Sequence, residues 1–272
     1  MGLDSRLLKN IVLAATMALF PGTYSSTYAA DGRATSVEPR LLREFEPRFR
    51  ASVLRGWRSF QTSFAGDGLA CVHCHLDHGT MRHWAGAYPK VEVFDGTPYR
   101  VKGLRQVVLE ALEKHTDLSP EQRAALAEDL VAYIAWWGDG GLVTPGRSRA
   151  SPPAAEDLAR LRASVERGSG LFQRRDLGPC GRCHHSGEKA STPDKTPVGG
   201  AAATFPRYVK SAGRVMSLEA FLSWHLADIG KKGYSPEGSV VTDLAAYLVS
   251  LAGGKRLLPG GGRNGAGDQH DE

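Results

Sequence analysis

Two five-residue motifs carry the groups of this sequence that are best suited to chemistry: Cys71-Val72-His73-Cys74-His75 and Cys180-Gly181-Arg182-Cys183-His184. Both follow the pattern C-x-x-C-H, in which two cysteine sulfurs form thioether bonds with a haem and the histidine binds its iron on the proximal side. The motifs account for all four cysteines of the chain. A zinc site built from both pairs, or a redox dithiol, stays open as an alternative. We expect two covalently bound haem c groups, attached at Cys71, Cys74, Cys180 and Cys183, with His75 and His184 as proximal ligands.

The ligand on the other side of each iron decides whether a haem carries electrons or binds a small molecule. For the second motif the candidates are His225 and Met216, because His185 is adjacent to His184 and cannot reach across the porphyrin. His225 falls in a predicted helix with Leu218, Phe221 and Leu222, so its side chain is expected to point inward. We favour His225, and Met216 stays open.

For the first motif the candidates are His115, Met81 and His83; His78 lies closer still to His75. Measured from Leu104 and Leu218, which begin similar segments, His115 and His225 are one helical turn apart and share a helix face. We favour His115 as the distal ligand, with Met81 and His83 as competitors. A surface position near a helix end would suit His115 equally well.

An internal repeat organises the rest of the chain. The segment from Arg50 to Gln61 returns between Arg162 and Gln173 with eight of twelve residues identical, and a haem motif follows each copy. Later, Asp129-Leu130-Val131-Ala132-Tyr133 is echoed by Asp243-Leu244-Ala245-Ala246-Tyr247, and Ser119-Pro120-Glu121 by Ser235-Pro236-Glu237. The chain therefore reads as a tandem duplication of one haem-binding unit.

Each unit is expected to contain three helices that position its haem motif. Apolar spacing and capping residues predict a first helix at about 40–61 in one unit and 155–173 in the other, and a second helix at 103–115 and 217–229. The third helix begins at the Ser-Pro-Glu sequence of each unit and runs to Trp137 or Leu251. This order is that of a class I cytochrome c domain. We predict an all-α fold of two tandem class I cytochrome c-like domains, each wrapped around one haem: residues 30–137 and 155–252, joined by a linker at 138–154 and followed by a flexible tail at 253–272. His270, in that tail, is expected to face solvent.

The first 29 residues have the features of a secretory signal. Arg6 and Lys9 precede a ten-residue apolar run from Ile11 to Phe20, and small residues lead to a cleavage site near Ala29/Ala30. The run is too short to span a bilayer, and no later run is longer, so we expect no membrane span in the mature chain. Export to the periplasm agrees with haem attachment. The formal charge of +5 falls by one on cleavage, which favours an acidic redox partner and gives no indication of nucleic-acid binding.

The sequence resembles the SoxA-type diheme cytochromes of sulfur oxidation and, more distantly, the diheme thiosulfate dehydrogenases. The resemblance rests on Cys71–His75 followed by Ala87-Tyr88-Pro89-Lys90, on Thr204-Phe205-Pro206-Arg207-Tyr208, and on Gly213-Arg214-Val215-Met216-Ser217-Leu218-Glu219. It implies two class I-like domains in the periplasm and partnership with a small monohaem cytochrome c. Those families place a distal cysteine on the second helix of the unit, whereas this chain has His225 there and no fifth cysteine.

The leading functional hypothesis is therefore a periplasmic diheme electron carrier. Two alternatives stay open: a diheme redox enzyme, of the thiosulfate dehydrogenase type or a small-molecule reductase, and a haem-bearing subunit of a sulfur-oxidation complex. A diheme peroxidase is disfavoured because the sequence has no further elements of that family. A histidine pair on each iron favours a low reduction potential and pure electron transfer.

Overall fold

The structure is a computed structural model that describes residues 42–75, 81–92, 100–147, 153–174, 180–187, 196–231 and 233–262. The predicted signal peptide, His78 and His270 lie outside these residues. In the part described, residues from 42 onward belong to one compact unit. Both haem motifs therefore lie in the same unit.

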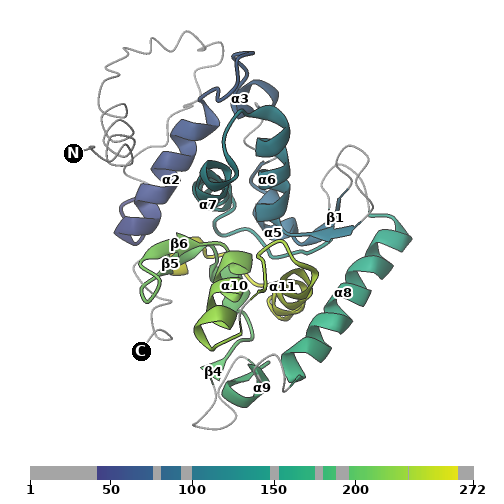
Figure 1. The fold of residues 1–272 in the computed structure, drawn as a ribbon. Helices are drawn as coiled ribbons and strands as arrows, with labels where there is room; N and C mark the ends of the chain where they lie inside the picture. The colour runs from purple at the N-terminus through teal and green to yellow at the C-terminus, as the bar shows by residue number, and fades with distance from the viewer. Residues whose placement is uncertain are drawn as a thin grey trace, which may run out of the picture. The chain divides into compact units, whose positions relative to one another are not determined.

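The chain is mainly helical, with two similar series of elements in its two halves (Figure 1). The first half contains α2 (Pro47–Phe60), α3 (Cys71–Cys74), α5 (Trp84–Ala87), β1 (Lys90–Glu92), β2 (Arg100–Lys102), α6 (Leu104–His115) and α7 (Pro120–Trp137). The second half contains α8 (Ala155–Gln173), α9 (Cys180–Cys183), β3 (His184–His185), β4 (Thr196–Pro197), η1 (Ala201–Thr204), β5 (Arg207–Val209), β6 (Arg214–Met216), α10 (Leu218–Asp228), α11 (Ser239–Leu251) and η2 (Pro259–Gly261).

Three short strand pairings were not predicted and qualify the expectation of an all-α fold. β1 pairs antiparallel with β2, β5 antiparallel with β6, and β3 parallel with β4. The strands are two or three residues long, which is too short for the alternation that identifies a strand in a sequence. Each antiparallel hairpin directly precedes the helix that carries a candidate distal histidine, α6 or α10.

Local capping explains where several helices begin. Ser119 forms a capping box with Gln122 at the start of α7, and Pro120 occupies the first helical position. In the second half the related Ser-Pro-Glu forms a turn, in which the Ser235 hydroxyl accepts from the Glu237 N–H and the Gly238 N–H donates to the Ser235 carbonyl. The extended Gly238 then caps α11, so this helix begins at Ser239 and not at Ser235 as predicted.

The start of α2 also differs from the prediction of a helix from about residue 40. Residues 42–46 form a turn that buries Leu42 and Phe45, and the helix begins at Pro47. A Glu46 carboxylate oxygen accepts from the Phe49 N–H at 2.7 Å and caps it. Proline is favoured at the first position because its missing N–H would have no helical partner there.

In each half the first helix packs against the last, α2 on α7 and α8 on α11, through the same contacts (Figure 1). Ser52 Oγ donates to Asp129 Oδ1 at 2.5 Å, and Ser164 Oγ donates to Asp243 Oδ1 at 2.6 Å. An arginine completes each cluster, with Nε 2.7 Å from the aspartate in both halves: Arg55 in the first and Arg167 in the second.

Glycine lets these helices approach closely. A Cβ added at Gly56 or Gly168 would overlap the main-chain carbonyl of Asp129 or Asp243 and lie 2.8 Å from the Cβ of Tyr133 or Tyr247. The same tyrosines contact Phe60 and Phe172, with ring centroids 5.4 Å apart in each half. The sequence repeat is thus also a repeat of three-dimensional contacts.

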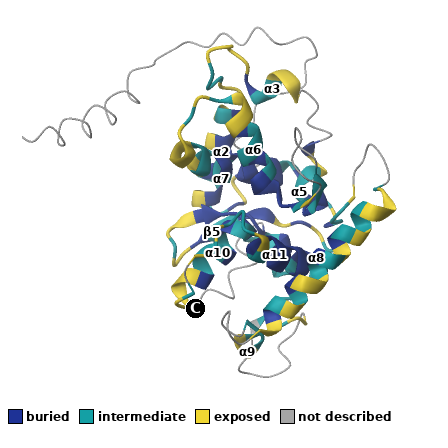
Figure 2. Ribbon diagram, turned by 45° about the vertical axis from the view of Figure 1, so that its right-hand side comes forward, coloured by how far each residue is buried: buried dark blue, intermediate teal, exposed yellow. Residues whose placement is uncertain are grey.

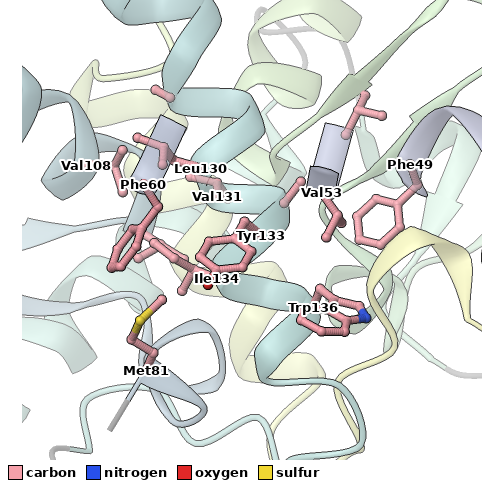
Figure 3. Packing of buried hydrophobic residues seen from close by; sticks show 14 of the residues in the cluster. Phe49, Val53, Phe60, Met81, Val108, Leu130, Val131, Tyr133, Ile134 and Trp136 are labelled. Atoms are coloured by element: carbon pink, nitrogen blue, oxygen red, sulfur yellow. The ribbon is translucent and has the colours of Figure 1, made fainter. Parts of the chain in front are cut away.

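Two hydrophobic cores lie at these crossings, and the burial of α7 and α11 is visible in Figure 2. Figure 3 shows the first core around Phe60, Tyr133 and Trp136, with Met81 below. The halves also exchange contacts: the β1–β2 hairpin packs on α8, and the β5–β6 hairpin packs on α2. Val215 of β6 belongs to the first core, and Val143 belongs to the second.

The segment predicted as a linker and the start of the predicted tail pack against one another. The Val143 N–H donates to the Lys255 carbonyl at 2.8 Å, and the Leu257 N–H donates to the Gly141 carbonyl at 2.7 Å. Leu257 is buried, and η2 packs on β5 and α7. The prediction of a flexible tail is therefore wrong for residues 253–262, because apolar Leu257 and Pro259 anchor a glycine-rich segment; residues 263–272 lie outside the described part.

Candidate haem sites

The two cysteine pairs form single-turn helices, α3 and α9, at matching places after α2 and α8. Cys71 packs against the first core and Cys180 against the second, while Cys74 and Cys183 are exposed. Burial raises the pKa of the Cys71 and Cys180 thiols. Because each pair belongs to a different core, the structure does not bring the four cysteines together, and no group of three His, Cys, Asp or Glu suited to a metal ion occurs among the described residues.

His75 lies in an aromatic environment next to α3. Its ring centroid is 5.1 Å from that of Trp84 in an edge-on arrangement and 6.5 Å from that of Phe60. Its pKa is lowered, first by burial and second by the charge of His115. His115 therefore contributes to the electrostatic environment of His75.

His115 is the last residue of α6, where its side chain is exposed. Gly103 begins the helix, and Leu104, Val108 and Leu112 bury its inner face. The alternative role of His115 as a favourable charge at a helix C-terminus is compatible with this position. The role of His115 as a distal ligand therefore stays a prediction.

His184 and His225 form the clearest pair. Their ring centroids are 6.2 Å apart, with an angle of 62° between the planes. Phe221, one helical turn before His225 on α10, stacks on the His225 ring at 5.5 Å with an interplanar angle of 9°. Burial lowers the pKa of His225, which favours the neutral imidazole that binds metals.

The spacing of this pair provides a test of whether one iron fits between the rings. Two imidazoles on opposite sides of one metal ion have centroids about 6.5 Å apart, from a metal–nitrogen bond of about 2.1 Å and ring bonds of about 1.33 Å. The observed 6.2 Å is close to that value. The residues of the second half therefore fit a haem held between His184 and His225.

Two of the competing ligands are buried and one is exposed. Met81 is fully buried among core residues such as Phe60 and Ile134 (Figure 3), and the Phe60 ring also contacts His75. Met216 is 1% exposed and belongs to the second core. His83 is exposed and immediately precedes α5.

Some residues around the sites were not predicted. Trp84, in α5, contacts His75. Residues 76–80 separate α5 from the haem motif in the sequence, and no sequence pattern predicted this contact. His73 is exposed, and its Nδ1 accepts from the Ala70 N–H at 2.8 Å at the start of α3. His185 Nδ1 accepts from the Gly187 N–H, which agrees with its exclusion as a distal ligand.

Known proteins are similar to this chain in sequence and in structure. No protein-family model matches the chain. The L-cysteine S-thiosulfotransferase subunit SoxA of Allochromatium vinosum is 25% identical over 245 residues, which cover 88% of this chain and 81% of the relative. The crystal structure of SoxXA from P. pantotrophus matches with a TM-score of 0.59 at 17% identity, over 78% of this chain and 76% of that one.

These comparisons support the resemblance to the SoxA-type family, and the structural match shows a shared fold. In the part of the chain that was searched, no helix is long and apolar enough to cross a membrane.

Proposed function

We propose that this chain is a SoxA-like diheme c-type cytochrome that transfers electrons during the oxidation of sulfur compounds. Its similarity to SoxA over most of both chains supports the sulfur-oxidation setting. The observation that carries electron transfer is the 6.2 Å separation of His184 and His225, since two histidines on one iron leave no position open for a substrate.

At each site, some residues of the chain attach the haem and others bind its iron. Cys71 and Cys74 attach one haem and Cys180 and Cys183 the other, so neither group can dissociate. His75 and His184 act as proximal ligands, and His115 and His225 as distal ligands. Bound haem supplies a one-electron couple between ferric and ferrous iron.

Met81 and Met216 are buried in the two cores, and each stays a competitor for its iron. His83 is the remaining competitor at the first site. A tandem duplication, supported by the paired Ser–Asp–Arg clusters and the paired Gly–Asp contacts, accounts for the presence of two equivalent sites.

The proposed location is the periplasm, with residues 1–29 as a cleaved signal peptide, because haem c is attached outside the cytoplasm. The proposed partners are other redox proteins, among them a small monohaem cytochrome c with an acidic docking surface. The SoxA and SoxXA names of the two similar proteins favour an assembly with a second subunit.

A second candidate function is catalysis as part of such an assembly. The name of the Allochromatium relative, a subunit of an L-cysteine S-thiosulfotransferase, favours it. All four cysteines of this chain lie in the haem motifs, so no free thiol remains to accept a sulfur group. For this reason we rank electron transfer first.

The test uses the full chain produced in a bacterial host that matures c-type cytochromes. The haemochrome assay and the intact mass are expected to give two haems per chain. Magnetic circular dichroism is expected to show two low-spin ferric signals with the near-infrared transitions of bis-histidine ligation, and carbon monoxide is expected to bind slowly. A high-spin ferric haem or rapid carbon monoxide binding would contradict the carrier role for that haem. Sustained reduction of an acceptor that depends on thiosulfate would support the catalytic alternative.

A further inference from the structure

The helices that carry His115 and His225 begin close to residues of the opposite half. Gly103 is the N-cap of α6 and Ser217 the N-cap of α10, and each helix has its histidine in the last turn. The position of either histidine therefore depends on how the far end of its helix is held.

The start of α10 is bound by a carboxylate from the first half. Glu128, on α7, accepts the Ser217 N–H through Oε2 at 2.6 Å and the Ser217 hydroxyl through Oε1 at 3.4 Å. The Ser217 hydroxyl in turn accepts from the Ala220 N–H inside the helix at 3.2 Å. Ser217 is 2% exposed, so these contacts are largely protected from water.

Arg105, on α6, fixes the Glu128 carboxylate. Its Nε donates to Glu128 Oε1 at 2.5 Å, and its Nη1 contacts the Glu237 carboxylate in the segment that leads to α11. Arg105 is 6% exposed, so one buried guanidinium joins Glu128 of the first half to Glu237 of the second.

A contact in the opposite direction lies beside this pair. The Glu219 carboxylate of α10 lies so close to Gly103 that a Cβ at that glycine would overlap Oε1. Arg105 and Glu219 follow Leu104 and Leu218, so they occupy matching positions in the two halves and carry opposite charges. Each half thus supplies a carboxylate beside the N-cap of the other half's ligand helix.

We infer that Glu128 and Arg105 are positioning residues for the second haem: together they fix the start of α10 and thereby hold His225 opposite His184. The inference rests on the proposed function, because it takes His225 as a ligand. From Ser217 to His225 the helix rises about 12 Å, at about 1.5 Å per residue. A tilt or rotation of α10 at Ser217 therefore moves the imidazole directly, and a ligand misplaced by about 1 Å binds poorly.

The test substitutes Glu128→Gln in the full haem-bearing chain. The side chain keeps its shape, but its amide nitrogen faces the donors of Ser217 or Arg105 and cannot accept from them. The expected result is a carbon monoxide affinity about ten-fold higher at the second haem, within the range of coupling between sites in proteins. The shift is assigned to that haem by the near-infrared transition that changes in His225→Met.

Two further variants separate positioning from a loss of stability. Glu113→Gln, an exposed carboxylate on α6 whose side chain is 70% accessible, serves as the matched control and is expected to leave carbon monoxide binding unchanged. Glu128→Asp keeps the charge and is expected to restore most of the wild-type behaviour. If Glu128→Gln lowers the melting temperature but leaves the second haem's transition and carbon monoxide affinity as in the wild type, the positioning role is overturned.

Arg105→Lys keeps the proposal testable if Glu128→Gln does not yield protein. A lysine ammonium does not reproduce the fork that reaches Glu128 and Glu237 together, so the same change at the second haem is expected. An unchanged second haem in that variant would also overturn the proposal. If His225→Met leaves the near-infrared transitions unaltered, the proposed ligand set is wrong. If His225→Met changes those transitions but Glu128→Gln does not, the ligand set stands and only the positioning role is wrong.

Discussion

The imidazole rings of His184 and His225 have centroids 6.2 Å apart with 62° between their planes, although the two residues come from different elements, β3 and α10. Phe221 stacks on His225 and fixes the plane of its ring from within the same helix. Packing of α10 thus holds the imidazole in one orientation before any metal contributes.

The first prediction concerns the reduction potential of the second haem. His225→Met is expected to raise that potential, because a methionine and histidine pair stabilises ferrous iron relative to two histidines. Spectroelectrochemical titration of the full chain measures it. Met216→Leu, a swap of similar volume in the second core, is the control and is expected to leave both potentials unaltered. If Met216→Leu and not His225→Met changed the ligand transitions, methionine would be the ligand.

The second prediction tests the close approach of α8 and α11. Gly168→Ala is expected to destabilise the protein by about 2–3 kcal/mol, because its Cβ would overlap the Asp243 carbonyl and the backbone must shift. Gly170→Ala, two residues later on the exposed side of the same helix, meets no atoms and is expected to stabilise it by about 0.5–1 kcal/mol. Denaturant unfolding of both variants measures the difference, and equal effects would contradict the contact.

Sequence patterns were sufficient to predict most of the helices, for identifiable reasons. The apolar spacing of α6 and α10 is strong, and Ser119 with Pro120 is a reliable start signal. The same signal failed at Ser235 because Gly238, three residues later, adopts an extended conformation and caps the helix itself. A start signal is reliable only if the next residues also favour a helix.

Contacts between the halves could not be predicted in the same way. The bond from Glu128 to Ser217 joins residues far apart in the sequence, and neither has an unusual neighbour that would suggest it. Likewise, three-residue strands gave no sign that each hairpin packs on the first helix of the other half. Such contacts depend on how the two halves pack against each other. An internal sequence repeat indicates that the halves have similar folds, but it does not indicate which of their surfaces are in contact.

The third prediction concerns pH. Burial, and secondarily the charge of Glu128, raises the pKa of Glu219 above its ordinary value of 4.5. The folded state therefore holds this proton more tightly than the unfolded state, so the contribution of Glu219 to stability is most favourable below pH 4.5 and declines as the pH rises through the folded pKa. Glu219→Gln is expected to remove this decline.

Urea unfolding of the haem-bearing protein between about pH 4 and 8 measures that effect, as the difference in unfolding free energy between variant and wild type. The difference should increase in favour of Glu219→Gln with rising pH. Glu113→Gln, at an exposed site, is the control. A difference that is constant with pH would show that the Glu219 carboxyl has the same pKa in both states.

The fourth prediction concerns the thiols before haem attachment. Burial raises the pKa of Cys71 and Cys180, whereas Cys74 and Cys183 are exposed to solvent. Because the thiolate is the reactive form, iodoacetamide at neutral pH should alkylate Cys74 and Cys183 first in the reduced, haem-free chain. Peptide mass spectrometry over time measures the order, with a denatured sample as the control in which all four react alike. Faster labelling of Cys71 or Cys180 would mean that the haem-free chain does not hold α3 and α9 against their cores.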